Sequence, residues 1–317
     1  MSRFIIIISF LLAAASALHA QADPAVRIDT IQYASHSNYP LHLYLARPVI
    51  AEKPLPCIVF VPGSAWKKQR MERSLHAVIK MAKMGYAAAS VEYRPCNVAL
   101  FPAQVVDAKT ATRYLREHAT ELGLDSRNFF AWGSSSGGHT VLLQAFTQDS
   151  ALLDSCSFSS ATALQGPASR FEGNSTASGS GNRMPAEPTS CKVNAVVDYY
   201  GPSELVHEFR IQDSYDDPAK DHGLLLGDPL HEKRGVALKA SPLYHVHPYV
   251  VPVFIVHGTA DKVVPLEQSL WLEKRLKECG ARVESVILEG QKHGGAAFWT
   301  DELLGSIDSF LQSCMIK

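Results

Sequence analysis

The chain lacks an excess of charge of either sign, and this excludes several classes of partner. Its 317 residues include 30 Lys and Arg against 31 Asp and Glu, so the formal net charge is -1 at pH 7. A protein with so little excess charge has no general field to gather nucleic acid or an anionic membrane surface. We therefore expect no nucleic-acid partner and a ligand that is neutral or locally recognised.

Metal-binding patterns and repeats are also missing. The sequence has no CxxC pair and no His-rich cluster, which are common signs of a metal site. It has no internal repeat of solenoid or propeller length. We expect no metal, and the 46% hydrophobic content is enough for a sizeable globular core.

No apolar run near the N-terminus is long enough to span a bilayer. The run from Phe4 to Ala15 is followed by a segment rich in small residues. A membrane anchor would need about 20 apolar residues, whereas this layout is typical of a secretory signal peptide. We expect residues 1–22 to be a signal peptide cleaved near Ala20 or Ala22. The mature protein would be secreted or periplasmic, without stable membrane insertion.

Export would place six cysteines in an oxidising compartment, where 15 pairings are possible. Spacing favours Cys156 with Cys191, because these residues bracket a segment of unusual composition. Cys279 with Cys314 is a second candidate pair. Cys57 lies in an apolar run and is interpreted as a small buried hydrophobe.

The rest of the chain, 23–317, is predicted to be one α/β domain. Short apolar runs alternate with stretches of helical spacing, as in a mostly parallel sheet with helices on both faces. Helical spacing is clearest around 105–115, 272–279 and 303–311. The predicted strands are Leu41 to Leu45, Cys57 to Val61, Ala87 to Val91, Phe129 to Trp132, Ala195 to Tyr199, Val253 to His257 and Val283 to Leu288.

A segment at about 155–190 interrupts this pattern. It is rich in Ser, Gly, Ala, Thr and Pro, has no apolar periodicity, and contains the glycosylation sequon Asn174-Ser175-Thr176, which has meaning only in a eukaryotic host. It could be a lid over an active site. Its position between a helix and the start of the next strand favours a surface insertion on the side away from the strands' carboxyl ends.

The motif with the clearest chemical meaning is a GxSxG sequence with Ser135 at its centre. Gly133 and Gly137 flank this serine, a strand precedes it, and a helical stretch follows. Strand, sharp turn and helix are the context that a nucleophile elbow requires. We predict that Ser135 is a nucleophile.

A serine nucleophile needs a base, and a base needs an acid partner. His293 is the preferred base because it lies in a turn after the last strand, whereas His139 and His257 are interpreted as structural. Asp261, in the loop after another strand, is the preferred acid, with Asp198 as the alternative. The order Ser, Asp, His is that of the α/β-hydrolase triad.

The reaction also needs donors for an oxyanion. The backbone amide of Ser136 is one candidate, and those of Ser64 and Ala65 are the others, in the turn after a predicted strand.

Together these motifs make the chain similar to the α/β-hydrolase superfamily, and within it to the acetylxylan and feruloyl esterases and the hormone-sensitive-lipase-like carboxylesterases. The resemblance runs from about Leu41 to the C-terminus. Its motifs are Gly63-Ser64-Ala65-Trp66, Glu92-Tyr93-Arg94-Pro95, Phe101-Pro102-Ala103-Gln104 with Asp107, Gly133 to His139, Tyr200-Gly201-Pro202-Ser203, His257-Gly258-Thr259-Ala260-Asp261 and His293-Gly294. The resemblance implies an internal ion pair between Arg94 and Asp107.

One departure concerns the oxyanion loop. Members of the group usually carry His-Gly-Gly-x-Trp there, and Pro62, Ser64 and Ala65 replace the His and the later small positions. Ser and Ala tolerate a positive φ less well than Gly, so the conformation of this loop is the open question.

The resemblance implies a secreted serine esterase that needs no cofactor. The expected substrate is an acylated carbohydrate, with acetyl or feruloyl groups removed from plant polysaccharide, and substrate choice is expected to lie in Pro202 to His247. Alternatives are a broad carboxylesterase, a peptidase similar to prolyl oligopeptidase, and a non-catalytic hydrolase-like binding protein.

Overall fold

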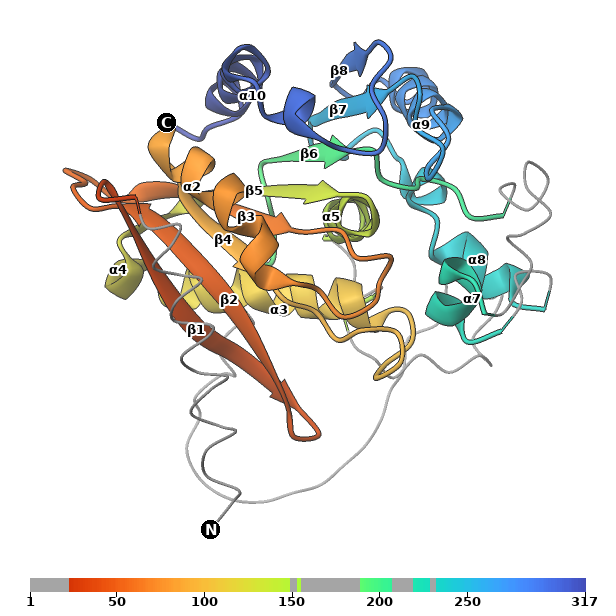
Figure 1. Ribbon diagram of the computed structural model, residues 1–317, viewed down its shortest axis with the longest axis horizontal. Coiled ribbons are helices and arrows are strands. Elements are labelled where there is room, and N and C mark those ends of the chain that lie inside the picture. Colours follow the sequence, from red (N-terminus) through yellow and green to blue (C-terminus); the bar gives the residue numbers. More distant parts are fainter. Residues whose placement is uncertain (1–22, 149–152, 155–188, 207–218, 229–231) are drawn as a thin grey trace, which may run out of the picture.

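The computed structural model describes residues 23–148, 153–154, 189–206, 219–228 and 232–317. Eight strands form one sheet in the order β1-β2-β4-β3-β5-β6-β7-β8 (Figure 1). The pairs from β4 through β3 to β8 are parallel, whereas β1 and β2 add an antiparallel edge. The strands are β1 (Val26–His36), β2 (Tyr39–Pro48), β3 (Leu55–Val61), β4 (Ala87–Val91), β5 (Leu124–Ser134), β6 (Ala195–Tyr199), β7 (Val253–Gly258) and β8 (Val283–Leu288).

Helices cover both faces of this sheet. Residues of α3, α5 and α9 pack on one face, and residues of α2 and α10 pack on the other. Along β3, Cys57 and Val59 belong to the first cluster, and Ile58 and Phe60 to the second, so the strand is apolar on both sides. The helices and 3-10 turns are η1 (Met71–Ser74), α2 (Leu75–Lys83), α3 (Ala103–Glu117), α4 (Ala119–Leu122), α5 (Ser136–Phe146), α7 (Asp221–Leu226), α8 (Arg234–Lys239), η2 (Pro242–His245), α9 (Glu267–Glu278), η3 (Ala296–Trp299) and α10 (Asp301–Ser313).

The predicted fold class and all seven predicted strands are confirmed, but the edge strand β1, helix α2 and several short helices were not predicted. The edge strand β1 has only Val26 and Tyr33 buried, so it has no apolar run to mark it. Helix α2 does bury Leu75, Val78 and Ala82 at helical spacing, and this signal was overlooked.

The cysteine predictions have different outcomes. Cys57 is fully buried, and this burial raises the pKa of its thiol to about 12, as expected for a core residue. The pairing of Cys279 with Cys314 is wrong, because both thiols are free. Cys279 packs on the cluster that contains α9 and Cys314 on the cluster that contains α10, so the sheet separates them.

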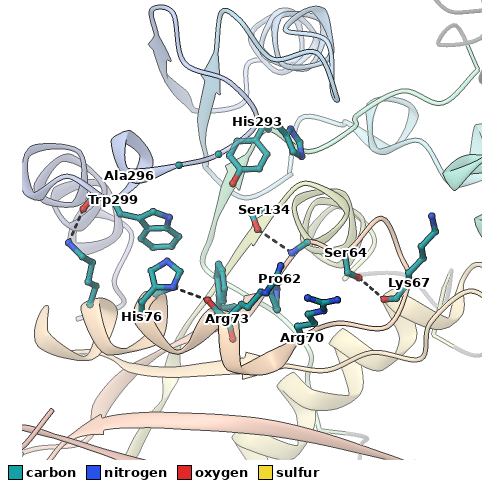
Figure 2. A pocket seen from close by; sticks show the side chains of 18 of the residues that line it. Pro62, Ser64, Lys67, Arg70, Arg73, His76, Ser134, His293, Ala296 and Trp299 are labelled. Atoms are coloured by element: carbon teal, nitrogen blue, oxygen red, sulfur yellow. Dashed lines mark hydrogen bonds between the residues drawn. The ribbon is translucent and has the colours of Figure 1, made fainter. Parts of the chain in front are cut away.

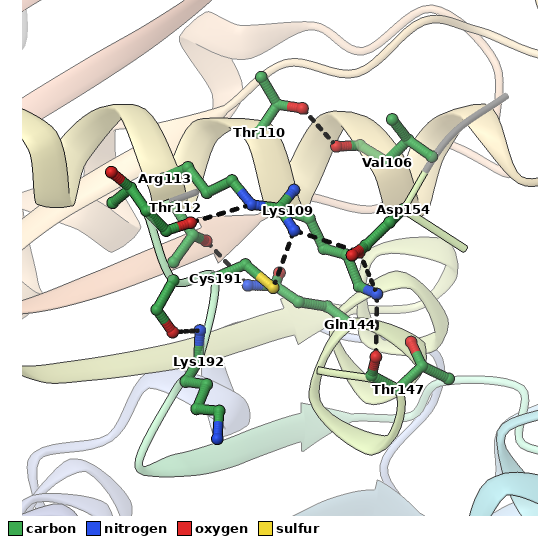
Figure 3. A network of polar contacts seen from close by, with 12 residues as sticks. Val106, Lys109, Thr110, Thr112, Arg113, Gln144, Thr147, Asp154, Cys191 and Lys192 are labelled. Atoms are coloured by element: carbon green, nitrogen blue, oxygen red, sulfur yellow. Dashed lines mark hydrogen bonds and ion pairs between the residues drawn. The ribbon is translucent and has the colours of Figure 1, made fainter. Parts of the chain in front are cut away.

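Three sequence predictions fall on residues outside the described part of the chain: the signal peptide, the sequon and Cys156. Most of the 155–190 insertion also lies outside it. The described residues at its two ends contact α3 (Figure 3). The buried Lys109 Nζ donates to Thr147 O at 3.0 Å and to Asp154 Oδ1 at 2.9 Å, and Arg113 Nη2 lies 3.5 Å from Cys191 Sγ. The described residues that flank the insertion, Asp154 and Cys191, therefore both lie beside α3.

A buried ion pair fixes the loop after β4. Arg94 Nη2 donates to Asp107 Oδ1 at 2.6 Å, and the backbone amide of Arg94 donates to Asp107 Oδ2 at 2.8 Å. Two residues later, the amide of Cys96 donates to Trp66 O at 2.8 Å. The ion pair implied by the resemblance is present, and it supports the segment that contacts Trp66.

Removing the charge of Asp107 should destabilise the protein strongly. Asp107 is fully buried and Arg94 is 8% exposed, so Asp107→Asn would leave an unpaired guanidinium in the interior. We expect the free energy of unfolding to fall by about 3 to 5 kcal/mol, measured by urea denaturation. Asp29→Asn is the matched control, because Asp29 pairs with Arg27 and Arg47 near the surface and should cost about 1 kcal/mol or less. Equal losses in both variants would contradict the prediction.

Candidate active site

The sharp turn between β5 and α5 presents Ser135. This residue has φ 54° and ψ -126°, a strained backbone conformation for a residue with a side chain. Its amide donates to Tyr199 O at 2.8 Å. A Cβ at Gly133 would lie 2.2 Å from Gly137 O, and one at Gly137 would lie 1.9 Å from Val61 O. The two glycines of the motif are therefore required by close backbone packing.

The structure brings together the three residues predicted as a catalytic triad. His293 Nε2 lies 2.9 Å from Ser135 Oγ, and His293 Nδ1 lies 2.6 Å from Asp261 Oδ2. Because the carboxylate accepts at Nδ1, the ring carries its proton there and leaves Nε2 free to accept from the serine hydroxyl. This is the arrangement in which an imidazole can activate a serine.

Asp261 is held in place by several donors. Its Oδ1 accepts from the amides of Val263 at 2.8 Å and Val264 at 3.0 Å, and its Oδ2 lies 3.3 Å from His257 Nε2. Burial of Asp261 opposes ionisation, but the hydrogen bonds from His257 and His293 outweigh it and hold the pKa of the carboxyl below its ordinary value. Asp261 therefore stays charged.

The alternative acid, Asp198, has a different environment. It is fully buried on β6, and its Oδ1 accepts from the amide of Gly201 at 3.1 Å, away from His293. Burial raises the pKa of Asp198 to about 7. A carboxyl that is half protonated at neutral pH is poorly suited to stabilise an imidazolium, so the geometry and the charge both favour Asp261.

The two histidines interpreted as structural are both buried and hydrogen-bonded. His139 Nδ1 accepts from Trp66 Nε1 at 3.2 Å and Nε2 donates to Ala240 O at 2.6 Å. Burial lowers the pKa of His139 to about 3, so its ring is neutral. His257 Nδ1 accepts from Ser269 Oγ at 2.7 Å, and Nε2 donates to Val264 O at 2.9 Å. Neither contacts Ser135 through its ring, and His139 holds Trp66.

The loop predicted to form the oxyanion site is unusual in its backbone. Ala65 and Trp66 have φ of 53° and 54°, so two residues with side chains occupy the left-handed region. Ser64, which stands at a glycine position of the family motif, is not among the residues with positive φ. The loop is held by Trp66 against His139 and by the hydroxyl of Tyr93, which lies 2.8 Å from Ser64 Oγ.

The three predicted oxyanion donors are not equivalent. The amide of Ser64 already donates to Ser136 Oγ at 2.9 Å, so in this state it is engaged inside the protein. The amides of Ala65 and Ser136 have no acceptor among the described residues. Ser136 also begins α5, where the first amides have no partner within the helix. All three stay predicted donors, and the amides of Ala65 and Ser136 are the ones without an acceptor among the described residues.

Tyr200 is a site residue to which the sequence analysis gave no role. Its ring centroid lies 4.5 Å from that of His293, and a Cβ at Gly294 would come within 2.9 Å of its hydroxyl. It lies directly after β6 with φ 45°. The ring of Tyr200 packs against His293 and fixes the orientation of the imidazole. The Tyr200-Gly201-Pro202-Ser203 motif was the signal in the sequence that could have identified this residue.

A cavity of about 980 Å³ opens beside His293 (Figure 2). None of its described lining residues comes from Pro202 to His247, the segment expected to select the substrate. Among the described residues, η1, α2 and the segment around η3 form its walls. Residues 207–218 and 229–231 of the expected segment lie outside the described part of the chain, so its role in substrate choice stays a prediction. The lining residues are Phe60, Pro62, Gly63, Ser64, Lys67, Lys68, Arg70, Arg73, Ser74, His76, Ala77, Lys80, Ser134, Tyr200, His293, Gly294, Gly295, Ala296 and Trp299.

Two kinds of feature are absent from the described residues. No group of three His, Cys, Asp or Glu side chains there is arranged to hold a metal ion. No helix there is long and apolar enough to cross a bilayer.

Two proteins named as esterases are similar in sequence to about three quarters of this chain. Esterase LipC of Mycobacterium tuberculosis is 28% identical over 249 residues, which are 76% of this chain and 53% of that protein. Esterase LipQ of the same organism is 25% identical over 231 residues, 73% of this chain and 48% of that protein. The chain spans about half the length of the curated relatives it matches.

Solved structures of esterases are similar to this chain over most of its length. A truncated form of a carbohydrate esterase from gut microbiota has a TM-score of 0.70 and 25% identity, covering 91% of this chain and 95% of that chain. The thermophilic esterase Est2 of Thermogutta terrifontis, with propionate bound, has a TM-score of 0.66 and 26% identity, covering 90% and 94%. Residues 41–276 also match the sequence profile described as BD-FAE. The chain has the α/β-hydrolase fold and belongs to the BD-FAE family.

Proposed function

We propose that this protein is a serine carboxylic-ester hydrolase. The observation that carries the proposal is the continuous hydrogen-bonded line from Ser135 Oγ to His293 Nε2 at 2.9 Å and from His293 Nδ1 to Asp261 Oδ2 at 2.6 Å. The line ends in a buried carboxylate and begins at a hydroxyl held on a strained turn beside a cavity. Its relatives LipC and LipQ are named esterases, which supports the proposal.

The reaction follows from the protons in this line. His293 Nε2 takes the proton of Ser135 as the oxygen attacks the ester carbonyl, and Asp261 stabilises the imidazolium that forms. His293 then gives the proton to the leaving alcohol, which departs and leaves an acyl group on Ser135. Water, deprotonated by the same nitrogen, attacks the acyl carbonyl, and the proton returns from His293 to Ser135 Oγ as the acid leaves. No cofactor takes part in these steps.

The negative charge that develops on the carbonyl oxygen needs fixed donors. The amides of Ala65 and Ser136 are suited to this role, since neither is used by the described residues. Such donors act best when they are oriented before the reaction, because no reorganisation is then needed as charge develops. The contacts of Trp66 with His139 and of Ser64 with Tyr93 provide that rigidity.

For the substrate, we propose an acylated carbohydrate, with acetyl or feruloyl groups removed from plant polysaccharide. The carbohydrate esterase from gut microbiota supports this, and so does a cavity wide enough for more than an acyl chain. A broad carboxylesterase is the alternative favoured by the Est2 likeness. A non-catalytic binding protein is less well supported, since the three side chains of a catalytic triad are in hydrogen-bonding positions. A peptidase is less well supported because the named relatives are esterases.

Replacing the nucleophile tests the proposal directly. With p-nitrophenyl acetate and acetylated xylan as substrates, Ser135→Ala should lower kcat by about 10⁴ to 10⁶. A proline-linked aminoacyl anilide should not be cleaved by either protein. Ser309→Ala, an exposed serine on α10 whose hydroxyl donates to Gly305 O, is the control. Equal ester hydrolysis by the wild type and Ser135→Ala would refute the proposal.

The two candidate acids should respond very differently to removal of their charge. Asp261→Asn should lower kcat on p-nitrophenyl acetate by about 10⁴, because an amide would leave His293 without its charged partner and in the wrong tautomer. Asp198→Asn should lower kcat by less than about tenfold, since its amide oxygen can still accept from Gly201. The reverse order of effects would assign the acid to Asp198.

Asp198→Asn also has a stability signature of its own. The pKa of Asp198 is about 7 in the fold against an ordinary 3.8, so the folded state holds this proton more tightly than the unfolded state. The contribution of this bound proton to the free energy of unfolding is complete below about pH 4 and is lost as the pH rises through 7. Relative to the wild type, Asp198→Asn should therefore gain stability between pH 4 and 8, by up to about 1.4 kcal/mol per unit of pKa difference.

We also propose that the protein is exported by residues 1–22. The short apolar run followed by small residues supports this. Expressed in a secreting host, the protein should appear outside the cytoplasm with Gln21 or Asp23 as its first residue by amino-terminal sequencing. Secreted protein that still begins at Met1 would contradict the proposal.

A further inference from the structure

One wall of the cavity beside His293 carries a stripe of cations. Arg70 lies directly before η1, and Arg73 lies within it, three positions further on. Lys80 follows on α2, two helical turns after Arg73. All three line the cavity, and at about 2.0 Å per residue in the 3-10 turn and 1.5 Å in the α-helix the stripe spans about 16 Å.

Among the described residues that line the cavity, none is acidic and could neutralise these charges. Five of these residues are Lys or Arg. Glu72 lies between the two arginines in the chain, but it is not part of the lining. The whole chain has a net charge of -1, so the positive charge of the described lining is a local feature of the cavity.

The cations of the lining differ in whether a carboxylate already lies close to them. Lys67 contacts Asp221 at 2.6 Å, and Lys80 lies 3.7 Å from the exposed Asp301. Within the described ranges, the side chains of Lys68, Arg70 and Arg73 have no ion-pair partner. All three are exposed, so their charges are available to a ligand in the cavity.

The stripe lies close to the reacting groups. Figure 2 shows Arg70 and Arg73 on one side of Ser134 and His293 on the other, with Trp299 beside His76. Ser134 and His293 line the same cavity as the arginines. A molecule whose ester reaches Ser135 would therefore extend along this wall.

We propose that the substrate of this site is an ester of an acidic carbohydrate, with carboxylate groups on the sugar units beyond the scissile bond. The inference rests on the proposed ester hydrolysis and names the class of substrate. Guanidinium groups match carboxylates in a planar, bidentate geometry. Because the cations are spread over a stripe and do not converge on one point, they fit several spaced anions on one chain better than a single phosphate.

The inference is tested with matched substrates that differ only in charge. One is an acetylated uronate-containing oligosaccharide, and the second is the same compound with its carboxylates converted to primary amides. A third is an acetylated, sulfated oligosaccharide without uronate. We expect kcat/KM to be roughly tenfold higher for the carboxylate than for the amide form at low salt. This preference should shrink by 0.3 M NaCl, since screening shortens the range of the charges.

The variants locate the preference at the stripe. Arg70→Gln with Arg73→Gln should remove most of the ratio between the carboxylate and amide substrates. The control is Arg27→Gln with Arg127→Gln, which makes the same change in net charge on β1 and β5, outside the cavity. Its ratio should equal that of the wild type. Thermal unfolding of both double variants shows that each is folded.

A binding measurement keeps this test separate from that of the proposed function. Calorimetry with an unacetylated uronate oligosaccharide should show binding to the wild type and to Ser135→Ala, and weaker binding to the Arg70 and Arg73 double variant. Hydrolysis without charge preference, or a uronate oligosaccharide that binds both double variants equally, would overturn the inference and leave the esterase proposal intact. Charge-dependent binding without any ester hydrolysis would refute the esterase proposal and, with it, the assignment of a substrate, while a cationic binding surface would remain. A higher kcat/KM for the sulfated substrate would overturn the assignment to carboxylates.

Discussion

The site depends on the close approach of backbone at the turn that carries Ser135. Gly137 lies against Val61 O and Gly133 lies against Gly137, so a single added methyl group at either position would push β3, β5 and α5 apart. This contact fixes the serine between two strands and a helix and compensates for its positive φ. The position of the nucleophile is therefore set by the packing of the sheet and not by its own side chain.

The other parts of the site are held by contacts that cross between elements. His139, on the nucleophile's own helix, accepts from Trp66, so α5 orients both the serine and the loop opposite it. Ser136 links the same two elements through its hydroxyl, and Tyr93 joins from the loop after β4. These contacts keep the strained backbone of Ala65 and Trp66 in place.

Much of the architecture could be predicted because buried parallel strands are continuous apolar runs and the nucleophile motif has fixed neighbours. The positions of His293 and Asp261 followed from the order of the elements. What could not be predicted was set by tertiary contact. β1 is polar because it is an edge strand, and the engagement of the Ser64 amide depends on a hydroxyl 72 positions away. The role of η1 and α2 as a cavity wall depends on how they pack against η3, and spacing alone does not report this.

The neutral ring of His139 has a consequence for the working range of the protein. Since burial keeps its pKa near 3, the ring nitrogen that holds Trp66 does not take up a proton in mildly acidic surroundings. The loop beside the nucleophile thus keeps its shape over a range of acidity in which an exposed histidine would become charged. The hydrogen bond that joins α5 to the Trp66 loop is in this way protected from mild acid by burial, independently of the groups that transfer protons during turnover.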